Sequence, residues 1–280
     1  MASGEAQDDL QYHSARHRWD LIDLQEVWRF RELIWMFAVR DFKVRYRQTF
    51  VGIAWAVVQP LAMMLVFSFF FRVSGGRPSD NGLPYAITAL CGLIPWQLFA
   101  STVSSGTQSI VINQQLVTKV YFPKIILPLS SVAVALVDFS IAFCMLLVVM
   151  AWYQVVPTAA ILLLPLMLVI VVVCSLAVSL WLSALNAIYR DVQYLVPFML
   201  QLGLLASPTV YEASMVSPQW QWLYSLNPMA GALEGFRWAL LGTDPPALVP
   251  MAISMSCMVA LLLGGMIYFR RIERFFSDRI

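Results

Sequence analysis

The chain has 280 residues, of which 60% are hydrophobic and 12% charged, and its mean hydropathy is +0.73. Ordinary soluble domains have about 45–50% apolar and about 25% charged residues, so this composition excludes a soluble enzyme, a disordered chain and a disulfide-rich scaffold. It predicts an all-α integral membrane protein. The net charge of +2 is too small to indicate a nucleic-acid partner.

The first 22 residues are polar and lack the basic segment and apolar core of a signal peptide. We therefore expect residues 1–22 to form a tail that stays in the cytoplasm. His13 and His17 stand four residues apart without a third ligand nearby, and the four cysteines lie in apolar stretches without a C-x-x-C pair. The sequence thus predicts no metal site and no disulfide framework.

An amphipathic segment follows, within residues 23–48. From Asp23 to Arg40, apolar side chains cover one broad side of a helical wheel and charged side chains lie opposite. This pattern predicts a helix in the membrane interface, and the alternative is a cytosolic helix packed on a partner protein. Four basic residues at its end are expected to contact lipid headgroups or the phosphate of a lipid-linked substrate: Arg40, Lys43, Arg45 and Arg47.

Residues 49–280 contain six apolar segments that each reach the roughly 20 residues needed for a membrane-spanning helix. They are Val51–Phe71, Leu83–Val103, Ile125–Ala151, Ala159–Ala187, Val192–Tyr211 and Ala247–Phe269. Backbone polar groups cannot stay unpaired in lipid, so each segment is predicted to be helical. With both termini inside, 15 of the 18 Lys and Arg residues lie on the cytoplasmic side, which favours this orientation.

The segment between the fifth and sixth spans, residues 213–242, is too apolar for a simple outer loop. Pro218 and Pro228 divide it into two pieces too short to span. This predicts two re-entrant helices that form an outer gate, and the alternative is a surface amphipathic helix. Glu234 and Arg237 are three residues apart and can pair on one helix face. The residues assigned to the gate are Trp220, Trp222, Glu234, Arg237 and Trp238.

The sequence contains no phosphate-binding loop, no H-E-x-x-H and no G-x-S-x-G motif, so it predicts no catalytic residue and no nucleotide cofactor in this chain. Asp138 is the only acidic residue inside the predicted spans. One carboxylate makes a weak proton relay, which leaves structural pairing or a polar functional site as its role. Driven transport would therefore need an ATPase on another polypeptide.

Four blocks of the chain, in order, carry a resemblance: RDFKVRYRQTFVGIAWAVVQPL, LCGLIPWQLFASTVSSGTQSIVINQQLVTKVYFPKIILPL, WLSALNAIYRDVQYLVPFMLQLGLLASPTVY and LNPMAGALEGFRWALLG. They resemble the permease of type-2 ABC exporters, in particular the branch that exports O-antigen, teichoic acid and related polysaccharides. The resemblance covers roughly residues 25–275. It implies a homodimer with two copies of a separate ATPase that binds ATP and Mg, in the bacterial inner membrane.

The resemblance implies that the substrate is a lipid-linked glycan made on the inner leaflet. It also implies a coupling helix within residues 106–123 that contacts the ATPase, with the candidates Gln114, Gln115, Val117, Lys119, Tyr121 and Phe122. Two alternatives remain open: an exporter of a drug or small lipid, and a membrane-embedded glycan-processing enzyme. An enzyme would need a carboxylate pair or a histidine cluster, and the sequence shows neither.

Aromatic residues within the spans suggest how a glycan could move. Sugar rings stack their C–H faces on aromatic planes, so an aromatic and nearly uncharged path would let a polysaccharide slide. The candidates are Trp55, Phe67, Phe70, Trp96, Phe99, Tyr194, Phe198 and Tyr211. The alternative is that these side chains face lipid or pack the bundle.

Overall fold

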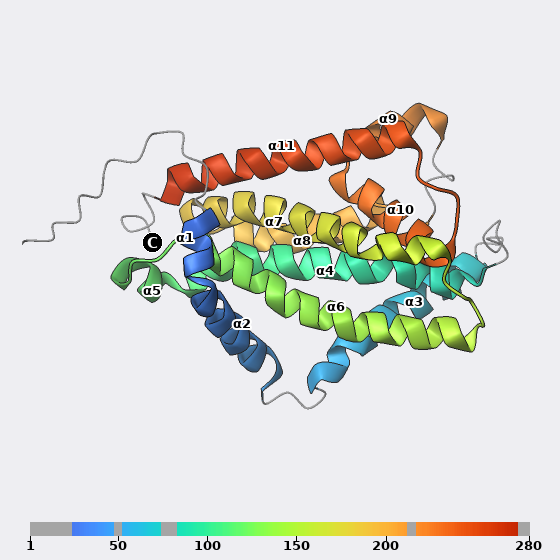
Figure 1. The fold of residues 1–280 in the computed structure, drawn as a ribbon, viewed down its shortest axis with the longest axis horizontal. Helices are drawn as coiled ribbons and strands as arrows, with labels where there is room; N and C mark the ends of the chain where they lie inside the picture. Colours follow the sequence, from blue (N-terminus) through green and yellow to red (C-terminus); the bar gives the residue numbers. More distant parts are fainter. Residues whose placement is uncertain (1–23, 48–51, 74–82, 212–216, 274–280) are drawn as a thin grey trace, which may run out of the picture.

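A computed structural model describes residues 24–47, 52–73, 83–211 and 217–273, and within these ranges all regular structure is helical. The long helices run roughly alongside one another in an elongated bundle (Figure 1). Several predicted features lie outside the described residues in whole or in part: the tail at 1–22, residues 23 and 48 of the interface segment, Val51 of the first span, the gate residues 213–216 and the chain end at 274–280.

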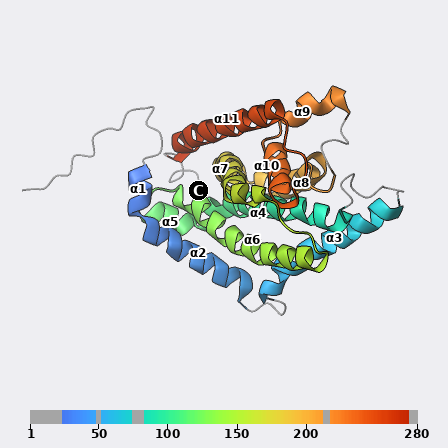
Figure 2. The same cartoon turned by 45° about the vertical axis from the view of Figure 1, so that its right-hand side comes forward.

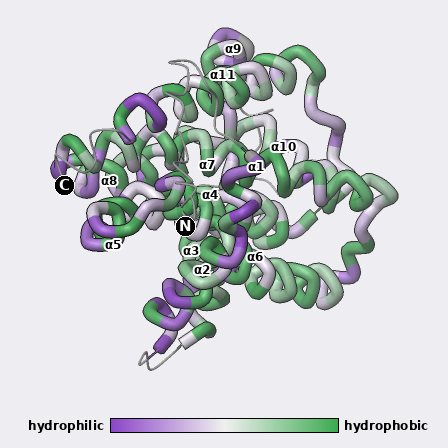
Figure 3. Tube along the Cα trace, turned by 60° about the vertical axis from the view of Figure 1, so that its left-hand side comes forward, coloured by the Kyte–Doolittle hydropathy of each residue, from purple (hydrophilic) through white to green (hydrophobic). Residues whose placement is uncertain are grey.

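The predicted interface helix is two helices, α1 (Leu24–Arg29) and α2 (Arg31–Tyr46), separated at Phe30. The helix therefore continues beyond Arg40 through most of the basic run. α2 packs against α6 and buries Phe37. Figure 3 shows the most hydrophilic part of the trace in α1, α2 and α5, whereas the long helices are mainly hydrophobic.

Among the described residues, five helices are long and apolar enough to cross a membrane, and they match five of the six predicted segments. Three of the five are single α-helices, and two begin with a short 3₁₀ turn, η1 (Gly52–Ala54) before α3 and η2 (Ala159–Leu163) before α7. The main helices are α3 (Trp55–Val73), α4 (Tyr85–Ile112), α6 (Ile126–Trp152), α7 (Leu164–Ile188) and α11 (Leu248–Glu273). Their number and composition make the chain a multi-pass membrane protein.

The fifth predicted segment, Val192–Tyr211, is shorter in the structure. α8 spans Val192–Ala206, 15 residues, which gives about 22 Å of helix at 1.5 Å per residue. It ends because Pro208 disfavours a helical backbone at the preceding residue, and Ser207 is extended with ψ 155°.

α4 lies at the centre of the bundle and contacts α3, α6, α7, α8 and α10. Small residues allow the closest of these contacts. A Cβ atom on Gly92 would lie 2.0 Å from the carbonyl oxygen of Thr209, and one on Gly106 would lie 1.9 Å from Oγ of Ser179. Close approach through small residues is typical of packing between membrane helices.

The predicted gate region forms a 3₁₀ turn, η4 (Pro218–Trp220), followed by α9 (Gln221–Ser225) and α10 (Pro228–Leu241). Asn227 caps α10 by accepting a hydrogen bond from the backbone N–H of Met229 at 3.0 Å. Gly242 ends the helix with φ +64°, a left-handed conformation that favours glycine. α10 packs against α4, α7 and α11, and Figure 2 shows it beside α7 and below α11.

Candidate substrate path and coupling surface

A cavity of about 590 Å³ opens between α3, α4, α6 and α8. Its walls combine the indoles of Trp55 and Trp96 with three amide side chains, Gln59, Gln97 and Gln201. The Gln97 Nε2 group donates to Gln59 Oε1 at 2.8 Å, which ties α4 to α3. Aromatic planes and neutral amides can stack against and hydrogen-bond a hydroxylated chain without holding it by charge.

An ion pair on the cavity wall joins α2 to α6. Arg45 Nη1 lies 2.6 Å from Asp138 Oδ2, and the Tyr46 hydroxyl donates to the other carboxylate oxygen. Arg45 also donates to Ser105 Oγ at 2.9 Å and to Ser101 Oγ at 3.2 Å. Burial and the bond to Asp138 raise the pKa of Tyr46 to about 12, so its hydroxyl remains a donor at neutral pH. The structural-pairing interpretation of Asp138 is therefore the one that the geometry supports.

The four residues of the predicted basic run differ in their contacts: two are hydrogen-bonded within the chain and two are exposed. Arg40 donates to Asp41 Oδ1 at 2.7 Å and to Asn113 Oδ1 at 2.7 Å, and Arg45 has the partners given above. Lys43 and Arg47 are exposed. The headgroup contact predicted for all four residues is thus geometrically open to Lys43 and Arg47, whereas Arg40 and Arg45 are engaged within the chain.

Two of the predicted path aromatics, Trp55 and Trp96, line the cavity. Phe99 is buried behind Trp96, with 5.1 Å between ring centroids, and Phe67 packs against the same core. Trp55 and Trp96 therefore face the cavity and Phe99 supports Trp96, whereas Phe67 belongs to the core.

The other predicted path aromatics lie elsewhere. Phe70 on α3 and Tyr194 and Phe198 on α8 are exposed on the outer surface of the single chain. Tyr211 follows α8 and lies near Tyr224, with 6.5 Å between ring centroids. A path through one chain does not bring all eight residues together.

The predicted coupling segment forms a short helix, α5 (Gln114–Lys119), between α4 and α6. Val117 and Phe122 are buried, and the Phe122 ring lies 6.0 Å from Phe37 of α2. The other candidates are exposed: Gln114, Gln115, Lys119 and Tyr121. The segment therefore has one face anchored to α2 and one face available to a partner.

After α5, the chain forms a hydrogen bond to the end of α11. The Lys124 backbone N–H donates to Glu273 Oε1 at 3.0 Å, close to the N-terminus of α6. A carboxylate at a helix N-terminus satisfies an otherwise unpaired backbone donor. A displacement of α5 would therefore also displace the start of α6 and the end of α11.

At the opposite end of the bundle, Arg237 of α10 is buried, with 4% of its surface exposed. Its guanidinium donates to the carbonyl oxygens of Pro208, Thr209 and Tyr211 at 3.1–3.2 Å, and of Thr88 at 3.5 Å. These carbonyls follow the end of α8 or belong to α4, so one side chain ties three elements together.

The ion pair predicted between Glu234 and Arg237 is wrong. Arg237 donates to backbone carbonyls instead, and Glu234 forms no salt bridge with it in the part of the chain that the structure describes. The two side chains line the same pocket. Of the other gate residues, Trp220 and Trp222 are exposed and Trp238 is partly buried.

Sequence reasoning missed the polar residues on the cavity wall and the partners of the arginines. A usable signal was present, because polar side chains in otherwise apolar spans tend to face a cavity or another helix. The missed residues are Gln59, Gln97, Ser101, Ser105, Asn113 and Gln201.

Comparison with known proteins gives one consistent family. The model of the ABC-2 type transporter family matches residues 32–241. The O-antigen export system permease protein RfbA of Myxococcus xanthus is 29% identical over 255 residues, which covers 90% of this chain and 97% of that protein. Two proteins of the same description from Klebsiella pneumoniae are 28% and 26% identical, each covering 74% of this chain and 79% of the relative. The chain belongs to the ABC-2 type transporter family.

Proposed function

We propose that this chain is the permease subunit of an ATP-driven exporter that moves a lipid-linked, O-antigen-like polysaccharide out of the cytoplasm. The observation that carries the proposal is the similarity to O-antigen export permeases along 90% of the chain. The cavity supports it, because its walls are aromatic and amide-bearing and its ion pair is internally neutralised.

Two copies of the chain form the working channel in this proposal. α3 and α8 expose a broad apolar and aromatic surface, which includes Phe70, Tyr194 and Phe198. Pairing two such surfaces would place the outlying path aromatics between the protomers. Permeases of this family normally act with a separate ATPase subunit, and we assign α5 and the exposed Tyr121 to that contact. ATP and Mg belong to the partner.

The proposed membrane is the bacterial inner membrane, with six crossings and both termini in the cytoplasm. The concentration of Lys and Arg at one end of the bundle supports this orientation. α8 supplies about 22 Å of the fifth crossing, and residues 207–211 would complete it.

We assign η4, α9 and α10 to a re-entrant outer gate. Ser254 Oγ donates to the carbonyl oxygen of Asn227 at 3.0 Å. Ser254 stands six residues inside α11, so the N-terminus of α10 lies about 9 Å below the start of that helix. α10 is buried and begins inside the bundle. Both features support the interpretation of α10 as a re-entrant helix and argue against a surface amphipathic helix.

In this mechanism, ATP binding by the partner moves α5. Because the α5 segment contacts α2 and is followed by a hydrogen bond between the start of α6 and the end of α11, these helices move with it. Rigid-body motion of packed helices is the expected form of such a change. The substrate then moves along the neutral aromatic wall.

Deletion of the gene from its host tests the proposal. Surface polysaccharide should disappear, lipid-linked glycan should accumulate in the inner membrane, and a plasmid copy should restore both. Unchanged surface glycan together with increased drug sensitivity would instead support a drug exporter. A glycan of altered structure without accumulation would support the enzyme alternative.

A further inference from the structure

A second pocket, of about 260 Å³, lies at the opposite end of the bundle from α5. α9, α10 and the start of α11 surround it, and it is separate from the cavity between α3, α4, α6 and α8. Typical pockets for drug-sized ligands measure about 300–1,000 Å³. The volume therefore suits a small molecule or a single unit of a larger one.

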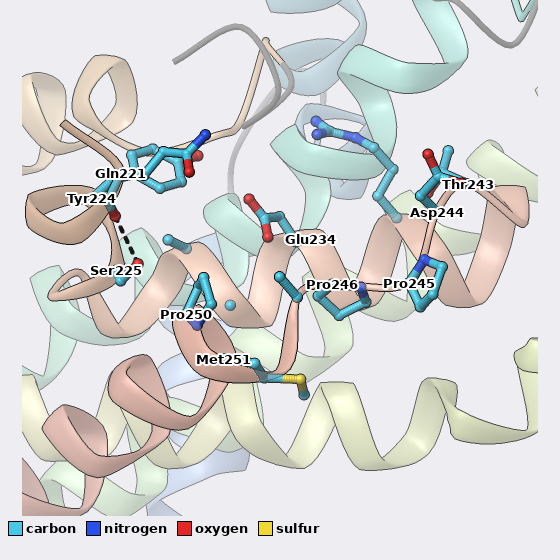
Figure 4. Close-up of a pocket in the computed structure, with 14 residues that line it drawn as sticks. Gln221, Tyr224, Ser225, Glu234, Thr243, Asp244, Pro245, Pro246, Pro250 and Met251 are labelled. Carbon is cyan, nitrogen blue, oxygen red and sulfur yellow. Dashed lines mark hydrogen bonds between the residues drawn. The ribbon is translucent and has the colours of Figure 1, made fainter. Parts of the chain in front are cut away.

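Three polar groups at this pocket have no hydrogen-bond or ion-pair partner among the described residues. Nε of the buried Arg237 forms no hydrogen bond, and the buried Tyr224 hydroxyl forms none either, in the described chain. The Glu234 carboxylate has no ion pair there. In Figure 4, Glu234 projects from α10 into the space between Tyr224 on one side and Asp244 on the other. Unsatisfied buried groups cost free energy, so a ligand that forms hydrogen bonds with them in this pocket would be stabilised.

The signs of the charges restrict the chemistry of that ligand. Glu234 and the exposed Asp244 disfavour an anion, whereas the guanidinium of Arg237 disfavours a cation. No group of three or more metal-ligating side chains occurs among the described residues. A neutral molecule that both donates and accepts hydrogen bonds satisfies all three polar groups.

The remaining wall is apolar. It includes Pro245, Pro246, Pro250 and Met251, and Figure 4 shows these side chains along one side of the pocket. A sugar presents hydroxyl groups around its rim and C–H groups on its face, which matches polar groups on one wall and aliphatic groups on the other. A purely apolar ligand would leave Glu234 and Arg237 unsatisfied.

We propose that this pocket binds one sugar unit of the transported glycan. In this arrangement Glu234 accepts from sugar hydroxyls, and Arg237 Nε and Tyr224 donate to sugar oxygens. The proposal rests on the proposed function for the source of the sugar, but the pocket's preference for a neutral polyol stands on its own contacts.

The test uses the purified permease with its ATPase in lipid nanodiscs. The probe is the soluble oligosaccharide released from the host's own glycan, and binding is followed by saturation-transfer NMR. Wild type should bind, and Tyr224→Phe and Glu234→Ala should each weaken binding about tenfold, the loss expected for one or two hydrogen bonds. The matched control is Trp222→Ala, an exposed aromatic of the same α9 that lies outside the pocket and should bind as wild type.

Three results would overturn the proposal. Wild type could show no sugar binding, or Trp222→Ala alone could abolish it, which would place the sugar on the exposed aromatic surface. Inorganic phosphate or calcium could raise the thermal stability of the complex while the sugar does not. Tyr224→Phe removes only one oxygen, so it keeps the test valid if Glu234→Ala fails to fold.

The proposed function can fail separately. If gene deletion leaves surface glycan intact while the purified complex binds sugar in this pocket, export of that glycan is refuted and the subsite stands. If deletion abolishes surface glycan while no sugar binds, the subsite is refuted and the exporter stands.

Discussion

Replacing Arg237 by alanine should destabilise the permease strongly, for a reason that has nothing to do with an ion pair. The guanidinium donates to the three carbonyl oxygens of Pro208, Thr209 and Tyr211 at 3.1–3.2 Å, and the fourth contact, to Thr88, is longer at 3.5 Å. Each buried acceptor left without a donor costs about 1–3 kcal/mol. Because water can enter from the neighbouring pocket, we expect a total of about 3–5 kcal/mol rather than the full sum.

That loss is measurable as a change in thermal unfolding. A change of 1 kcal/mol shifts the melting temperature of a protein this large by about 2–4 °C, so Arg237→Ala should lower it by about 6–20 °C. Unfolding of membrane proteins is often irreversible, so apparent melting temperatures are compared at one scan rate in nanodiscs. Arg237→Lys keeps the charge but loses the planar fork, and an intermediate shift is expected.

A double variant separates the two possible causes. If Arg237 and Glu234 were a buried ion pair, adding Glu234→Ala to Arg237→Ala would recover stability. Since they form no salt bridge in the described chain, although the charge of Arg237 acts on Glu234, we expect only a small coupling, well short of the recovery that a buried ion pair would give. Recovery in the double variant, or a melting temperature of Arg237→Ala equal to that of wild type, would refute the role of the carbonyl contacts.

Three further predictions concern the rest of the bundle. Asp138→Asn leaves the Arg45 guanidinium without its counter-ion in a half-buried site. Export should therefore fall, and the free energy of unfolding should drop by about 1–3 kcal/mol. Unchanged export and an unchanged melting temperature would contradict this prediction. Gly92→Ala places a Cβ 2.0 Å from the Thr209 carbonyl oxygen, and the forced shift of α4 should cost about 1–3 kcal/mol by thermal unfolding, so a neutral variant would show that the contact can relax. Tyr121→Ala and Lys119→Glu change exposed side chains, so they should reduce ATPase stimulation in the reconstituted complex without changing the melting temperature; normal stimulation in the double variant would remove α5 from the ATPase contact.

The long helices were predictable because lipid leaves the backbone few choices. A run of about 20 apolar residues must be helical to satisfy its own hydrogen bonds, whatever its neighbours are. α8 was predicted too long because apolar content continued to Tyr211, although Ser207-Pro208 already carried a stop signal. The steric effect of Pro208 on Ser207 ends the helix, although the apolar composition continues beyond it.

The partner of Arg237 could not be predicted from the sequence, and the reason is general. Spacing on one helix favours Glu234, three residues away, but such a pair is worth only about 0.2–0.5 kcal/mol. Residues 208, 209 and 211 follow the end of α8, so their carbonyl groups have no donor from that helix. The bundle brings those carbonyls to Arg237 from 26 to 29 residues away in the sequence.

For Asp138, the sequence indicates that the carboxylate needs a partner, but it does not indicate which residue that partner is. A lone carboxylate within an apolar span must be paired, and no basic residue lies near it on α6. Arg45 was assigned to lipid because its neighbours in the sequence are also basic. In the folded chain α2 crosses α6, and Arg45 reaches the carboxylate from 93 residues away. This pairing offsets one positive charge at the cavity wall, so in the proposed exporter the wall would form hydrogen bonds with a neutral glycan without holding it by charge.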